Sequence, residues 1–223
     1  MADILAKIKL HQAPETQYFK EESVKDQIYV HHTASSGNPN GVLGYWNGNE
    51  ERVGTAFLIP RGKGADWAED DIYQYFGSKY WGWHLGLKNK HLLNRGRSSK
   101  DMNKKSIGIE ICNWGQVVPS GQRYRTYAGS FVEENDIVSY PNKFRGYQFY
   151  QKYTDAQLES TRGLLIYLCE RFAIEKTFKG MEIFDIDSRC LLGENGIFTH
   201  VSCRPDKFDM HPQPELIQML SSL

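Results

Sequence analysis

The sequence of 223 residues has no net charge and no long apolar run. Its 27 basic residues cancel its 27 acidic ones, so the overall charge favours neither nucleic acid nor a membrane as a partner. No apolar run approaches the roughly 18 residues that a membrane span needs. The first residues, MADILAKIKLHQAPETQ, also lack the apolar stretch of a secretory signal. We therefore expect a protein that is made in the cytoplasm without a signal peptide.

Cysteine is also scarce, with four residues scattered along the chain. A chain of this length can bury a full core as one domain, since domains usually run ~50 to 250 residues. Such a core needs no disulfide framework. We expect reduced, mostly buried thiols in a monomer whose single domain spans residues 1–223.

Short strands and helices alternate along the chain. Residues 27–32 form a β-branched and aromatic run that is typical of a strand. Residues 53–60 predict a second strand, stopped by proline, and residues 72–76 its hairpin partner. Residues 106–111 have apolar side chains on alternate positions, which turns Glu110 away from the core side.

Helices account for much of the rest. Thr154 and Gln157 have the spacing of a capping box, and the apolar stripe behind them predicts a helix to about Phe172. The remaining predicted elements are a helix over residues 38–46, a strand over residues 196–200 and a helix over about 214–220. The alternation indicates an α/β fold with a mixed central β-sheet flanked by helices.

One stretch, from about residue 116 to residue 153, is polar and rich in tyrosine. It is too long for an ordinary connection, and long loops in compact domains are often lids or binding loops. We expect an inserted loop that forms a wall of the substrate site.

Candidate metal ligands gather near both ends of the chain. Catalytic zinc keeps three protein ligands, drawn from His, Cys, Asp and Glu, and leaves a fourth position open. His31 and His32 are neighbours on a predicted strand, so only one of them can face a given site. His200 is followed within eleven residues by further candidate ligands, namely Cys203, Asp206, Asp209 and His211.

Four motifs, taken together, resemble a known family. They are His-His-Thr-Ala at residues 31–34, Trp-His-Leu-Gly at 83–86, Ser-Ile-Gly-Ile-Glu-Ile at 106–111, and His200 followed by Lys-Phe-Asp at 207–209. This order is similar to the zinc amidases that include phage endolysins, cytoplasmic cell-wall recycling amidases and peptidoglycan-recognition proteins. The resemblance covers most of the chain and implies an N-acetylmuramoyl-L-alanine amidase.

The resemblance also implies roles for single residues. Matched position by position, His31, His200 and Asp209 would bind one Zn²⁺ per chain. Glu110 falls on the acid/base carboxylate of the family, and Lys207 on the lysine that steadies the developing oxyanion.

A further set of residues matches or flanks the motifs at the substrate. His84 matches a family residue near the substrate. The aromatic residues beside the motifs are suited to stacking on sugar or peptide, although a single aromatic residue more often serves packing. They are Tyr45, Trp81, Trp83 and Trp114.

The ligand assignment has alternatives. Asp209 is followed by Met-His-Pro, where related enzymes commonly have Pro-Gly. Cys203 and His211 therefore remain alternatives for the third ligand, and His32 for the first. An orienting role beside a zinc ligand is the alternative for Glu110.

The implied function is hydrolysis of the amide between N-acetylmuramic acid and L-alanine, with peptidoglycan or a muropeptide as the partner. The long insertion and the aromatic residues favour an extended ligand and hence a lytic, endolysin-like enzyme that acts on the cell wall once released. The alternatives are a cytoplasmic amidase that recycles muropeptides, a non-catalytic peptidoglycan-binding module, and a zinc hydrolase for an unrelated amide.

Overall fold

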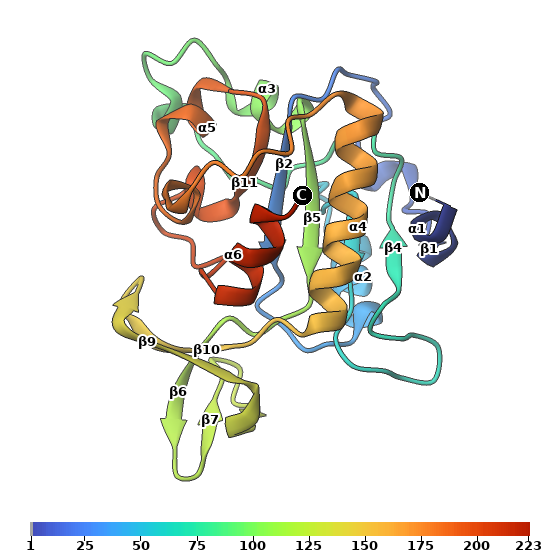
Figure 1. Cartoon of the computed structure of the whole chain (residues 1–223). Coiled ribbons are helices and arrows are strands. Elements are labelled where there is room, and N and C mark those ends of the chain that lie inside the picture. The colour runs from blue at the N-terminus through green and yellow to red at the C-terminus, as the bar shows by residue number, and fades with distance from the viewer. Residues whose placement is uncertain (1) are drawn as a thin grey trace.

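A six-stranded mixed sheet forms the centre of the molecule (Figure 1). The computed structural model describes residues 2–223. The strand order is β1-β4-β3-β5-β2-β11, and every neighbouring pair is parallel except β3 with β4. The strands are β1 (Ile8–Leu10), β2 (Gln27–His32), β3 (Phe57–Ile59), β4 (Ile72–Gln74), β5 (Ser106–Ile111) and β11 (Gly196–Thr199).

Helices cover both faces of this sheet, as the α/β prediction requires. Helix α4 crosses the front face in Figure 1, beside α6, and α2 lies behind the sheet. The helices are α1 (Ala2–Lys7), α2 (Pro39–Gly48), α3 (Ser99–Lys104), α4 (Asp155–Phe172), α5 (Ser188–Leu192) and α6 (Pro214–Ser221). Short 3₁₀ turns are η1 (Glu15–Gln17), η2 (Asn89–Leu92), η3 (Glu134–Asp136), η4 (Met181–Phe184) and η5 (His200–Ser202).

The strongest local patterns set the element boundaries. The hydroxyl of Thr154 accepts a hydrogen bond from the backbone N–H of Gln157 and caps α4, as predicted. All six residues of β2 are buried, because this strand lies inside the sheet with helices on both sides. The strand predicted over residues 53–60 is reduced to β3, and Val53 lies outside it in an isolated bridge with Trp83.

The prediction of a loop over residues 116–153 is wrong. This segment folds into a second, antiparallel sheet with the order β8-β7-β6-β10-β9, which we call the inserted sheet (Figure 1). Gly121 and Gly146 adopt positive φ at the turns between β6 and β7 and between β9 and β10. The strands are β6 (Gln116–Ser120), β7 (Arg123–Arg125), β8 (Phe131–Val132), β9 (Ile137–Phe144) and β10 (Tyr147–Gln151).

The four cysteines are free and buried, as expected. Between residues 2 and 223, no helix combines the length and the apolar character that crossing a membrane requires.

Candidate functional site

The candidate site lies at the ends of three neighbouring parallel strands. His31 of β2 pairs in register with Glu110 of β5, so both side chains project from the same face of the sheet. On the other side of β2, strand β11 ends at Thr199 and His200 begins the turn η5. The irregular segment that follows brings Asp209 back to this edge. Three distant parts of the sequence thus meet in one place.

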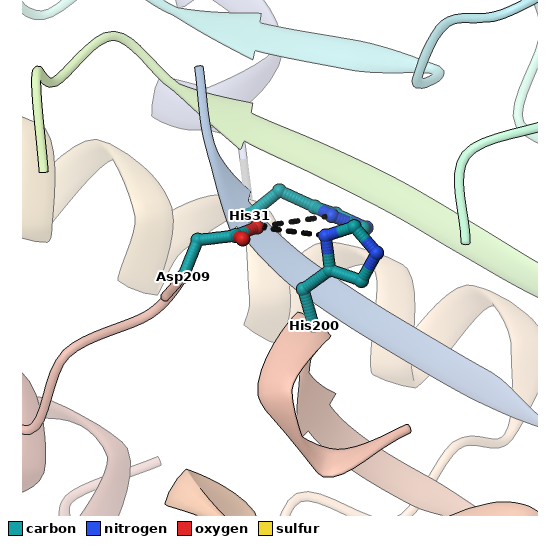
Figure 2. A group of neighbouring side chains, drawn as sticks. All are labelled: His31, His200 and Asp209. Carbon is teal, nitrogen blue, oxygen red and sulfur yellow. Dashed lines mark hydrogen bonds and ion pairs between the residues drawn. The ribbon is translucent and has the colours of Figure 1, made fainter. Parts of the chain in front are cut away.

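His31, His200 and Asp209 form a compact, buried cluster (Figure 2). One potential ligand atom from each residue lies within 4.8 Å of the other two. Oδ2 of Asp209 is 2.9 Å from Nδ1 of His200 and 3.4 Å from Nδ1 of His31. In tetrahedral zinc sites with bonds of about 2.0 to 2.1 Å, neighbouring ligand atoms lie roughly 3.3 Å apart. The cluster therefore has the residue types and the spacing of a zinc site.

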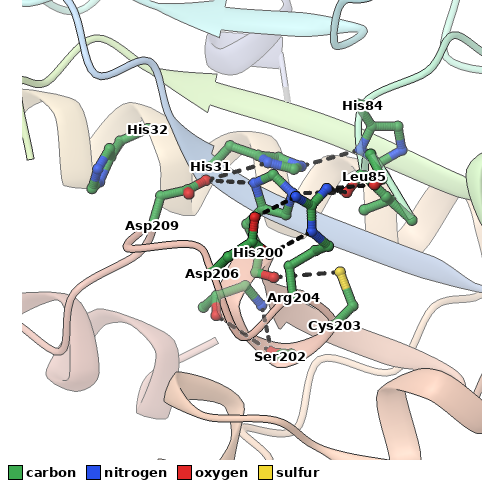
Figure 3. Close-up of polar contacts among 12 residues, drawn as sticks. His31, His32, His84, Leu85, His200, Ser202, Cys203, Arg204, Asp206 and Asp209 are labelled. Carbon is green, nitrogen blue, oxygen red and sulfur yellow. Dashed lines mark hydrogen bonds and ion pairs between the residues drawn. The ribbon is translucent and has the colours of Figure 1, made fainter. Parts of the chain in front are cut away.

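A chain of hydrogen bonds assigns the tautomer of His31, and Figure 3 shows its link between His31 and His84. The hydroxyl of Ser106 donates to the carbonyl of Met102 at 2.7 Å, so its oxygen must accept from Nε2–H of His84 at 2.9 Å. Nδ1 of His84 then accepts from Nε2–H of His31 at 3.1 Å. The lone pair on Nδ1 of His31 is left facing the cluster.

His200 is held in the same tautomer. Its Nε2–H donates to the carbonyl of Leu85 at 3.0 Å, which leaves the Nδ1 lone pair facing Asp209. Two imidazole lone pairs and a carboxylate oxygen thus converge with no hydrogen between them. Such a group of acceptors repels itself unless a cation lies among them, and this supports a metal ion as the natural occupant.

The protonation states at neutral pH also suit a metal. Burial, followed by the neighbouring His200, lowers the pKa of His31 to about 4, so His31 is neutral. Burial alone would raise the pKa of the Asp209 carboxyl, but positive charge on the neighbouring His200 and hydrogen bonds donated by either imidazole outweigh burial and hold this pKa well below its usual range, so the carboxylate requires a cation beside it. Metal ligands must be deprotonated, and both groups already are.

An open cavity of about 440 Å³ lies over the cluster. Glu110 and Lys207, both half-buried, line it together with the three clustered residues. Burial and then the charge of Asp209 raise the pKa of Glu110 well above its usual range, while Lys207 acts in the opposite direction. Among residues 2–223, no carboxylate forms an ion pair with Lys207, so its charge remains available to a ligand.

Comparison with known proteins now identifies the family. The family model described as N-acetylmuramoyl-L-alanine amidase matches residues 21–211. The chain belongs to this amidase family. No curated protein sequence gives a significant match to the amidase.

Solved structures share the fold of the amidase at low sequence identity. The structure of PlyL is 14% identical, with a TM-score of 0.53 and 96% of both chains covered. A mutant endolysin from Bacillus subtilis is 15% identical, with a TM-score of 0.52 and 96% of both chains covered. The amidase AmiD from E. coli, in complex with the substrate anhydro-N-acetylmuramic acid-L-Ala-D-gamma-Glu-L-Lys, is 17% identical with a TM-score of 0.52. That comparison covers 90% of the present chain and 59% of AmiD.

The alternative ligands of the amidase have other partners. His32 points to the opposite side of its strand from His31 (Figure 3), where its Nδ1 is 2.9 Å from the hydroxyl of Tyr153. The thiol of Cys203 donates to the carbonyl of His200. His211 is enclosed by the inserted sheet, where its Nε2–H donates to the carbonyl of Gln151 and its Nδ1 accepts from the hydroxyl of Tyr140.

The residues expected at the substrate divide into two groups. Tyr45 and His84 line the cavity over the cluster, and Trp114 lines a second cavity beside it. Trp83 lines neither cavity and instead packs edge-on against Trp81, with ring centres 5.1 Å apart.

Two parts of the site are absent from the sequence-based assignment. One is Ser106, whose place in the Ser-Ile-Gly-Ile-Glu motif was the available signal. The other is Tyr127 of the inserted segment, which lines the second cavity and which no sequence pattern distinguishes from its neighbouring tyrosines.

Proposed function

We propose that this amidase uses one Zn²⁺ to hydrolyse the bond between N-acetylmuramic acid and L-alanine in peptidoglycan. The observation that carries the proposal is the convergence of His31, His200 and Asp209 directly beside Glu110 and Lys207. Membership of the amidase family indicates which bond is hydrolysed, and the cluster provides the ligands for the metal.

The residues around the cluster then have distinct tasks. A bound Zn²⁺ would polarise the scissile carbonyl and lower the pKa of water towards ~7. Glu110 takes a proton from the attacking water and returns it to the leaving amine. Its raised pKa suits a carboxyl group that must carry this proton between the two steps. Lys207 stabilises the carbonyl oxygen as it becomes negative in the tetrahedral intermediate.

We favour a lytic, endolysin-like role on the cell wall over recycling of soluble muropeptides. The cavity over the cluster continues into a second, larger cavity, as an extended ligand would require. The muropeptide bound to AmiD also shows what lies on each side of the bond: a sugar on one side, and a peptide with a γ-linked D-Glu on the other.

Digestion of purified peptidoglycan tests the proposal. Zinc-loaded enzyme should release new L-alanine amino termini from intact sacculi, and more rapidly than it cleaves soluble anhydro-muropeptides. No new L-alanine termini in either substrate would contradict the amidase function. Activity confined to the soluble substrate would instead support recycling.

Removing the Ser106 hydroxyl should weaken zinc binding. In Ser106→Ala, Nε2–H of His84 loses its acceptor, so His84 no longer fixes the tautomer of His31. Loss of such an outer partner typically costs ~10- to 100-fold in metal affinity. We expect this loss in a competition titration with a zinc chelator.

Ser160→Ala is the matched control for that titration. Ser160 is also buried, but it lies on α4, and its hydroxyl donates to the carbonyl of Asp70 rather than to any residue of the cluster. Its zinc affinity should equal that of the wild type. Equal affinities in Ser106→Ala and the wild type would contradict the positioning role of His84 and Ser106.

A further inference from the structure

A second cavity of about 630 Å³ adjoins the cavity over the cluster. The two share one border, formed by Thr33, Ala34, Tyr45, Trp46 and Glu110. A ligand whose scissile bond lies at Glu110 can therefore extend into the second cavity without leaving the protein surface.

The inserted sheet builds the outer wall of this second cavity. Tyr127, in the segment between β7 and β8, donates a hydrogen bond from its hydroxyl to the carbonyl of Ala34 at 2.8 Å. Its ring also packs edge-on against Trp114, with ring centres 6.0 Å apart. These contacts hold Tyr127 in place, yet the residue remains 72% exposed. The wall is therefore ordered and open to a ligand.

The chemistry of the two cavities differs. Within the described part of the chain, Glu110 is the one acidic or basic side chain that lines the second cavity. The other lining groups are aromatic rings, small residues and the neutral polar groups of Thr33, Ser35, Ser36 and Asn38. The cavity over the cluster, by contrast, holds Lys207 and several ionisable groups.

We infer that the second cavity binds the neutral glycan strand of the substrate, beyond the muramic acid whose amide is cut. The inference rests on the proposed function. Pyranose rings present C–H edges to the electron-rich faces of aromatic rings, and hydroxyl and amide groups pair with their hydroxyls. Tyr45 and Tyr127, which are 70% and 72% exposed, offer such faces from two separate parts of the cavity lining, one on α2 and one in the inserted segment.

The peptide side of the substrate fits the second cavity poorly. A γ-linked D-Glu keeps a free carboxylate, and burial of a carboxylate requires a cationic partner. The second cavity has none among its described lining residues, and Glu110 at its border would repel the group. The other cavity opposes a carboxylate less, because Lys207 contributes a positive charge there. The glycan thus extends towards Tyr127 and the peptide away from it.

Kinetics on two matched substrates test the inference. Both carry the same stem peptide, one on a single N-acetylmuramic acid and the other on a glycan of at least four sugars. The wild type should show the higher kcat/KM on the long glycan. In Tyr127→Ala the ratio of kcat/KM values, long over short, should fall by about tenfold, as expected for the loss of one stacked ring.

Two variants separate ring stacking from general damage to the inserted sheet. Tyr127→Phe keeps the ring and loses only the hydrogen bond to Ala34, so its ratio should match that of the wild type. Phe131→Ala removes another exposed aromatic residue of the same sheet, outside the cavity, and should also leave the ratio unchanged. A Tyr127→Phe ratio as low as that of Tyr127→Ala would overturn the inference.

Binding of a peptide-free glycan gives a readout that does not depend on turnover. A neutral tetrasaccharide of N-acetylglucosamine should produce saturable quenching of tryptophan fluorescence in the wild type, because Trp46 and Trp114 line the cavity, and none in Tyr127→Ala. An enzyme that cuts peptidoglycan but neither binds this glycan nor distinguishes glycan lengths would contradict the second site alone. Failure to cut peptidoglycan at all would contradict the proposed function.

Discussion

Glu110→Gln is expected to lower kcat by about 10² to 10⁴, the usual contribution of a positioned acid/base group. Glutamine has the shape of glutamate but cannot take the proton of the attacking water. Glu110 is not one of the three clustered residues, so zinc content should remain one per chain. Turnover of a muropeptide and zinc analysis of the same preparation measure both effects.

Asp206→Asn is the matched control for this substitution. Asp206 is another carboxylate lining the same cavity, but it is not part of the cluster and is paired with Arg204. We expect this variant to keep most of the wild-type activity. Unchanged turnover in Glu110→Gln would remove Glu110 from the mechanism, and loss of zinc in that variant would instead support an orienting role.

His200→Ala should abolish both zinc retention and turnover. One of three proposed ligands is lost, and the remaining His31 and Asp209 cannot complete the site. Since loss of a mere outer partner costs ~10- to 100-fold in affinity, loss of a ligand should cost more than about 100-fold. Zinc content after dialysis against a mild chelator measures the effect, and added zinc should restore activity to the wild type but not to the variant.

Cys203→Ser tests the competing ligand assignment under the same conditions. The Cys203 thiol is buried and donates to the carbonyl of His200, so serine can make the same contact. This variant should keep its zinc. Loss of zinc from Cys203→Ser with retention in Asp209→Asn would show that the third ligand has been assigned to the wrong residue.

The parts of the fold with strong local patterns were predictable. The run over residues 27–32, the alternation over residues 106–111 and the capping box at Thr154 each specify one element, and β2, β5 and α4 have the expected positions. The inserted sheet was not predictable. Its strands are largely exposed, so they carry no regular alternation of apolar and polar residues.

The candidate site was likewise predictable only in part. The motifs nominated His31, His200 and Asp209, and the structure brings these three together. The motifs could not reveal the path from His31 through His84 to Ser106, because it joins three separate segments by side-chain hydrogen bonds. Such contacts depend on the packed fold rather than on any spacing along the chain.

The contacts of His211 limit how this enzyme can be redesigned. Both ring nitrogens of His211 are bound by the inserted sheet, at Tyr140 and at Gln151, and His211 lies two residues after Asp209. A chimera in which a short turn replaces the inserted sheet would leave two buried polar atoms unpaired, at a cost of ~1 to 3 kcal/mol each. That cost would fall on the segment that carries Asp209. Grafting a foreign loop at this position therefore requires an apolar replacement for His211 in the same design.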